Sequence, residues 1–135
     1  MQVQPVAPEF VHQVWPSVEG FFKAAEKFGV GDSTVDQLKL QIVSGAQTLL
    51  VASDNGKIMG AASMVMINTP NHRIAMISSA GGRGIADKDV LAQVVTWAKL
   101  QGATKIRAWA KDAQARLYRQ KMGLNTATHV VEKLI

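Results

Sequence analysis

The sequence contains no cysteine, and this absence excludes disulfide bonds and thiolate metal sites. Its three histidines, His12, His72 and His129, are far apart, and none has a partner at metal-ligand spacing. There is no basic-then-apolar leader and no apolar run of about 18 residues, which argues against secretion and against a membrane span. We therefore expect no metal site and a cytoplasmic location.

Aromatic residues are scarce, at 6% of the chain, and neither a Lys/Arg run nor an RNP-like aromatic motif is present. Both absences argue against nucleic-acid binding, although the net charge is +5. The charge is unevenly distributed: residues 1–72 carry four basic and six acidic side chains, whereas residues 73–135 carry eleven and four. This asymmetry predicts an anionic ligand in the second half, with nucleic acid as the less favoured alternative.

The stretch from Arg73 to Gly102 predicts a strand, a glycine turn and a helix. Apolar residues 74–77 precede two serines, and the turn 81–86 has three glycines in four positions. Apolar residues then recur at helical spacing up to Gly102, which is a typical helix stop. Backbone N–H groups uncovered by side chains, beside a helix N-terminus, form a seat for phosphate. An ordinary tight turn has the same appearance, and the spacing fits neither the Walker loop nor the dinucleotide motif.

Two amphipathic helices are predicted before this stretch. The first covers residues 8–29 and either begins at Pro16 or is broken there. The second is capped by Asp32 or Ser33 and ends at Gly45.

Strands are the other predicted elements, together with one more helix. Asp54-Asn55-Gly56 is typical of a type I′ hairpin turn. The predicted strands are 48–52, 57–67, 74–77, 103–110 and 129–135, and the additional helix is 113–122. Without repeats or linkers, residues 1–135 are expected to form one domain of the α/β class, with a mixed sheet and a hydrophobic core.

This order of elements resembles the GNAT acetyltransferase superfamily over nearly the whole chain. The resemblance rests on Lys57–Ala61, Gly81–Ala86, Ala98-x-x-x-Gly102-Ala103, Arg116–Leu124 and the closing Val131–Leu134. More narrowly, the Gly-Gly turn, Trp97-Ala98 and the Val-Glu-Lys-Leu ending resemble small GNAT-like proteins of tailed phages, several of which are encoded among virion structural genes. The resemblance implies a GNAT fold with a reduced C-terminus, in which strands 74–78 and 104–110 are parallel.

The resemblance also implies acetyl-CoA as cosubstrate. The family's phosphate-binding turn, Arg/Gln-x-x-Gly-x-Gly/Ala, is matched at Gly84 and Ala86, and the expected binding residues are Gly82, Arg83, Gly84, Ile85 and Ala86. Two departures stand out: Gly81 occupies the Arg/Gln position, and Asp87 places a negative charge beside the expected phosphates.

For catalysis, the family implies a backbone N–H near Ile77 that stabilises the oxyanion, and Tyr118 as general acid. Tyr118 is equally typical of a packing residue whose hydroxyl finds a partner. No residue clearly fills the role of general base; the candidates are Glu19, His72 and Ser78.

Two functions remain open from the sequence. The first is an acetyl-CoA-dependent N-acetyltransferase with an unknown amine acceptor, favoured by Gly84, Ala86 and Tyr118. The second is a catalytically inactive GNAT-fold structural or interaction protein, for example a virion component with self or other virion subunits as partners. Gly81 and the missing base favour this second interpretation.

Overall fold

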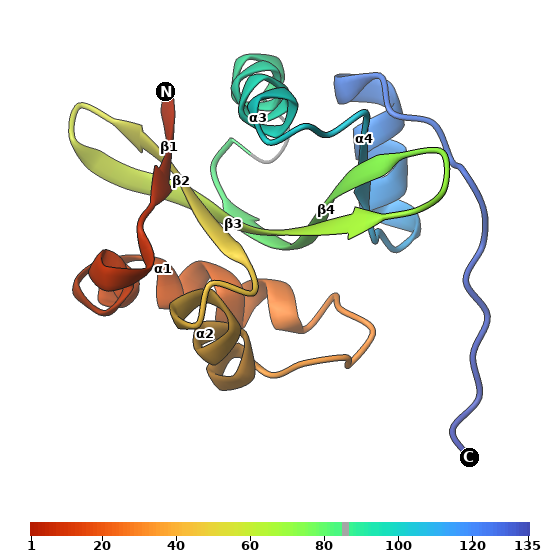
Figure 1. The fold of residues 1–135 in the computed structure, drawn as a ribbon, viewed down its shortest axis with the longest axis horizontal. Helices are drawn as coiled ribbons and strands as arrows, with labels where there is room; N and C mark the ends of the chain where they lie inside the picture. Colours follow the sequence, from red (N-terminus) through yellow and green to blue (C-terminus); the bar gives the residue numbers. More distant parts are fainter. Residues whose placement is uncertain (85–86) are drawn as a thin grey trace.

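The computed structural model describes residues 1–84 and 87–135 and shows a five-stranded mixed sheet with helices on both faces (Figure 1). The spatial order follows the chain, and only the last pair, β4 with β5, is parallel. The strands are β1 (Gln2–Val6), β2 (Thr48–Asp54), β3 (Lys57–Asn68), β4 (Arg73–Gly82) and β5 (Lys105–Ala108). The predicted mixed α/β fold and the predicted parallel pair are confirmed.

Helices cover the two faces of the sheet and bury two apolar clusters. A short 3₁₀ helix (Pro8–Phe10) leads into α1 (Val11–Glu26), which shares one face with α2 (Val35–Val43), while α3 (Lys88–Leu100) covers the other (Figure 1). Side chains alternate between the faces along a strand, so Leu49 and Val51 of β2 join the α1/α2 cluster. Leu50 and Ala52 join the α3 cluster. The last helix, α4 (Asp112–Met122), has no buried residue.

The first helix continues through Pro16, and the second begins later than expected. Pro16 lies inside α1, so the predicted start or break there is wrong. Tertiary packing outweighs the lost hydrogen bond, because Trp15 is buried and stacks on Phe22 at a centroid distance of 5.6 Å. Thr34, rather than Asp32 or Ser33, caps α2, because Gln37 three residues later completes a capping box.

The connection between β4 and β5 is the helical crossover that parallel strands need. The Asp87 carboxylate caps α3 by accepting hydrogen bonds from the N–H groups of Asp89 and Val90. At the other end Gly102 has φ of +85°, the left-handed conformation expected of a helix stop.

Two differences from the predicted strands concern the chain ends. The edge strand β1 is absent from the predicted elements, because it is short and contains Pro5, which is tolerated only where a strand N–H is not needed. The predicted strand at 129–135 is wrong, since these residues form neither helix nor strand. Val131 and Leu134 are 91% and 98% exposed, so no packing stabilises an extended pairing there.

The predicted glycine turn also begins later than expected. Gly81 and Gly82 belong to β4, where they pair with Ala61 and Gly60 of β3, so the turn itself starts at Arg83. A Cβ on Gly81 would lie 2.4 Å from the backbone oxygen of Phe21. Glycine is therefore needed at this position for α1 to approach the strand, which explains the departure from the Arg/Gln of the family motif.

Replacement of Gly81 with alanine is expected to lower the free energy of unfolding by about 2 kcal/mol, because the added methyl group forces α1 away from β4. Gly20→Ala is the matched control: Gly20 is exposed on α1, and a Cβ added to it would meet nothing within 4 Å. It should raise stability by about 0.5–1 kcal/mol. Urea denaturation of both variants measures the difference, and equal stabilities would contradict the packing argument.

Candidate functional site

The candidate site begins where β5 ends beside β4. The last parallel pair is Ile77 with Ala108, but β4 continues to Gly82. Beyond this pair no partner strand lies on that side of β4 within the described part of the chain. Residues 77–80 are only half-buried, although β4 is an inner strand of the sheet. Backbone N–H and C=O groups there are available to a ligand.

A β-bulge lies at the same point of the strand. Met64 pairs with Ile77, whereas the preceding residue Ser63 pairs with Ser79, so Ser78 is an extra residue on β4. The bulge changes the alternation of side chains along β4. As a result Ile77 and Ala80, three residues apart, both line a cavity on the α3 side of the sheet.

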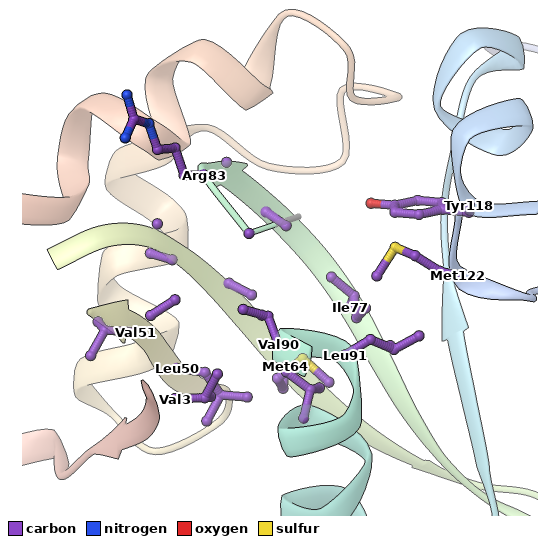
Figure 2. A pocket seen from close by; sticks show the side chains of 18 residues that line it. Val3, Leu50, Val51, Met64, Ile77, Arg83, Val90, Leu91, Tyr118 and Met122 are labelled. Atoms are coloured by element: carbon purple, nitrogen blue, oxygen red, sulfur yellow. The ribbon is translucent and has the colours of Figure 1, made fainter. Parts of the chain in front are cut away.

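The cavity lies between strands β1 to β4 of the sheet and the helices α3 and α4, and its walls are mostly apolar (Figure 2). Val90, Leu91 and Val94 contribute from α3, and Tyr118 and Met122 contribute from α4. Figure 2 shows the Tyr118 hydroxyl directed toward the end of β4. A narrow apolar cleft beside an unpaired strand edge fits an extended ligand with amide groups of its own.

Burial raises the pKa of Tyr118 above its ordinary value of 10.0 because the charged form would lose its hydration. Within residues 1–84 and 87–135, its hydroxyl forms no hydrogen bond. A phenol is protonated at neutral pH even at the ordinary pKa, and the raised pKa extends this protonated range to higher pH; the hydroxyl can donate a hydrogen bond into the cavity.

The turn between β4 and α3 has both favourable and unfavourable features for an anion. Gly84 has φ of +95°, and a Cβ there would lie 3.1 Å from Val90, so glycine is required. Arg83 and Lys88 are exposed and positively charged. Asp87, however, occupies two N–H donors of α3 and adds a negative charge. The N-terminus of α3 is therefore a weaker anion site than the sequence suggests.

Four of the predicted site residues line the cavity: Ile77, Arg83, Gly84 and Tyr118. Gly82 does not line the cavity; it is the last residue of β4 and pairs with Gly60 of β3. Ile85 and Ala86 lie outside the described residues. Sequence reasoning missed the other lining residues, among them Ala80, Gly81, Leu91, Val94 and Met122, as well as those that β1, β2 and β3 contribute. Small residues at 80–81 are a usable signal, whereas the α4 contribution of Met122 depends on tertiary packing.

The three base candidates lie in different places. Glu19 forms an ion pair with Lys23 on α1, at 3.1 Å. The His72 ring bonds Thr104 at 3.0 Å, beside the opposite end of the parallel pair from the bulge. Ser78 alone lies at the bulge. In the described ranges, no three His, Asp or Glu side chains form a possible metal site, and no helix has the length and hydropathy to cross a membrane.

The raised pKa of Tyr118 is directly measurable, because this is the single tyrosine of the chain. Its absorbance near 295 nm should titrate with a midpoint above 10 in the folded protein and near 10 in urea. Since the folded state binds the proton more tightly, this contribution to stability is complete below pH 10 and is lost as the pH rises through the folded pKa. Tyr118→Phe should remove both effects; an unshifted midpoint would contradict burial of the phenol.

A family-model comparison matches residues 15–124 to the acetyltransferase (GNAT) family. A comparison with curated protein sequences finds no match. Solved structures with the same fold include a ribosomal-protein-alanine N-acetyltransferase from Brucella melitensis biovar Abortus 2308, with 14% identity and a TM-score of 0.70, covering 99% of this chain and 100% of that one.

Two further structures carry small-molecule ligands. An aminoglycoside acetyltransferase from an uncultured soil metagenomic sample, in complex with sisomicin, is 12% identical with a TM-score of 0.72, covering 99% and 94% of the two chains. A predicted acetyltransferase with acetyl-CoA from Clostridium acetobutylicum is 14% identical with a TM-score of 0.66, covering 98% and 95%. Neither the family model nor these structures support the narrower resemblance to phage or virion proteins. The match over residues 15–124, with the fold described above, establishes that this chain belongs to the GNAT acetyltransferase family.

Proposed function

We propose that the protein is an acetyl-CoA-dependent N-acetyltransferase that acts on an amine acceptor. The observation that carries this proposal is the apolar cavity beside the unpaired end of β4, into which Tyr118 directs a protonated hydroxyl. Family membership and a fold neighbour solved with acetyl-CoA support the choice of cosubstrate. Neighbours named for acetyl transfer to aminoglycosides and to ribosomal-protein alanine support an amine as acceptor.

The residues around the cavity fit acetyl-CoA in chemical character. The unpaired backbone of β4 beyond Ile77 offers hydrogen bonds to the amide groups of an extended pantetheine arm, as an added strand would receive. The turn that contains Arg83 and Gly84, together with Ile85 and Ala86, would hold the pyrophosphate. Arg83 and Lys88 offset the negative charge of Asp87 there.

The chain's own groups provide two of the elements that acetyl transfer needs. A backbone N–H near Ile77 would stabilise negative charge on the thioester oxygen as the amine nitrogen attacks the carbonyl carbon. When the carbon–sulfur bond breaks, Tyr118 would donate its proton to the leaving thiolate. The phenol is protonated at neutral pH even at its ordinary pKa of 10.0, and burial raises that pKa further.

The inactive, structural interpretation loses one of its two supporting observations. Gly81 is the departure that favours it, but the contact with Phe21 accounts for glycine at this position. The second observation, the missing general base, still stands, whereas neither the family model nor the fold neighbours support a virion component.

Calorimetric titration with acetyl-CoA tests the proposal, together with thiol release in the presence of a mixed panel of amines. Because the protein has no cysteine, a thiol reagent reports only the CoA product. Asp87→Asn should bind acetyl-CoA about fivefold more tightly, because it removes a charge near the phosphates but keeps a good helix cap. Asp36→Asn, in the first turn of α2, is the control for charge alone. A chain that binds no acetyl-CoA and releases no thiol would refute the function.

Tyr118→Phe separates catalysis from cosubstrate binding. A general acid acts in the transition state, so its loss should lower kcat about a hundredfold or more while the Kd for acetyl-CoA stays nearly unchanged. Steady-state kinetics with the best amine of the panel measures the first quantity and calorimetry the second. Equal turnover by the Phe variant would remove Tyr118 from the mechanism but leave the transferase activity in place.

A further inference from the structure

A connected set of polar side chains lies in the apolar face that α1 and α2 cover. Ser63 is fully buried, and its Oγ lies 2.6 Å from the Oγ of Ser78. The Ser78 Oγ lies 2.5 Å from Oε1 of Gln47, in the loop before β2. Gln47 is joined in turn to Gln41 of α2 through both side chain and backbone. These hydrogen bonds satisfy Ser63, the one fully buried member, and fix the orientation of the half-buried Ser78 hydroxyl.

The direction of these hydrogen bonds follows from their chemistry. The amide nitrogen of Gln47 donates to Gln41, so its oxygen faces Ser78 and accepts the Ser78 proton. With the Ser78 proton directed at Gln47, the Ser63 hydroxyl donates to Ser78 at 2.6 Å, a closer acceptor than the backbone oxygen of Ser79 at 3.5 Å. With one lone pair engaged by Ser63, the Ser78 oxygen retains one that is free to accept another hydrogen bond.

Ser78 lies in the same segment of β4 as two residues that line the cavity, but its side chain is on the opposite face of the sheet. Ser78 is the extra residue of the β-bulge, in the half-buried part of β4 beyond the last pair with β5. Its neighbours Ile77 and Ala80 line the cavity on the α3 face, whereas Ser78 joins Ser63 on the α1/α2 face. Ser78 is itself half-buried, so a molecule that reaches this strand edge from the α1/α2 side meets both its hydroxyl and the backbone segment that borders the cavity.

The charged groups around this segment do not provide a base that contacts Ser78. Arg107 of β5 pairs with Met76 and so shares the α1/α2 face; it is positively charged and half-buried. Glu26 lies exposed in the last turn of α1, and Tyr118 on α4 is protonated. Among the described residues, the side-chain partners of Ser78 are the neutral Ser63 and Gln47.

We infer that Ser78 orients the attacking amine, which is taken up as its uncharged free base, and that Gln47 is the positioning residue that fixes the Ser78 hydroxyl. This inference rests on the proposed acetyltransferase function. An N–H of the amine donates to the free lone pair of Ser78, which aims the nitrogen lone pair at the thioester carbon. A neutral serine cannot hold the proton of an ammonium ion, and Arg107 repels a cation.

The proton balance follows from this arrangement. The amine nitrogen forms the new bond to the acetyl carbon, the carbon–sulfur bond breaks, and Tyr118 protonates the sulfur. The excess proton on nitrogen passes to water, and water restores the proton of Tyr118. Rates should follow the free-base fraction of the acceptor. At pH 8 this favours a peptide α-amine over a lysine ε-amine about a hundredfold, and the preference should shrink as the pH rises.

The experiment uses two probes, a lysine-free tripeptide with a free α-amine and Nα-acetyl-lysine amide, each with saturating acetyl-CoA. Ser78→Ala should lower kcat/KM for the tripeptide about tenfold and leave the Kd for acetyl-CoA nearly unchanged, while the melting temperature falls modestly because the buried Ser63 hydroxyl loses its acceptor. Ser78→Thr, which keeps a hydroxyl, should restore part of the loss. Gln47→Met should resemble Ser78→Ala, whereas Ser53→Ala, which removes a serine from a different strand, β2, should have no effect.

Three results would overturn the inference while leaving the transferase function in place. The first is wild-type kcat/KM in Ser78→Ala. The second is a preference for the ε-amine probe at pH 8. The third is a pH profile set by an enzyme carboxyl group and abolished by Glu26→Gln, which would identify a base instead. A wild type that binds acetyl-CoA but acetylates neither probe nor any panel amine would refute both proposals.

Discussion

The short parallel pairing between β4 and β5 is the constraint on which the site depends. Four residue pairs hold the two strands together, and β4 then continues for five residues without β5. Parallel pairing requires a crossover, and α3 provides it. The chain therefore leaves β4 at its carboxyl end, places the Arg83–Gly84 turn there, and returns along β5 to α4, which brings Tyr118 to the same end. Ligands of open α/β sheets bind at the carboxyl ends of strands for this reason.

Close backbone packing determines several residues that appear, in the sequence, to belong to a ligand motif. Cβ atoms on Gly60, Gly81 and Gly82 would lie 2.2–2.5 Å from backbone oxygens of Arg83, Phe21 and Met59. These glycines allow β3, β4 and α1 to approach one another under the turn. Gly84 differs, since a Cβ there would meet side-chain atoms of Val90 and Met1 rather than backbone. A glycine-rich turn can thus contain two kinds of glycine, and only packing distinguishes them.

Local signals make much of this fold predictable. The Asn55-Gly56 turn, the Gly102 stop and the helical spacing around Val94 depend on neighbours in the sequence, and the structure contains all of them. The edge strand β1 and the Gln47–Ser78–Ser63 connection depend on residues 15 or more positions apart, so no local pattern indicates them. For the candidate site, the family resemblance is enough to single out Tyr118 from the sequence. The bulge at Ser78 can be recognised only from the pairing of β3 with β4.

The bulge also explains how one strand segment can be apolar toward one face and polar toward the other. Strict alternation would place Ile77 and Ser79 on the α3 face and Ser78 and Ala80 on the other. The extra residue instead places Ile77 and Ala80 on the α3 face, while Ser78 and Ser79 oppose Ser63. An apolar arm and a polar nucleophile can then approach the same backbone from opposite sides. Since the proposed reaction joins two substrates at one carbon atom, this division of the two faces is what such a group transfer requires.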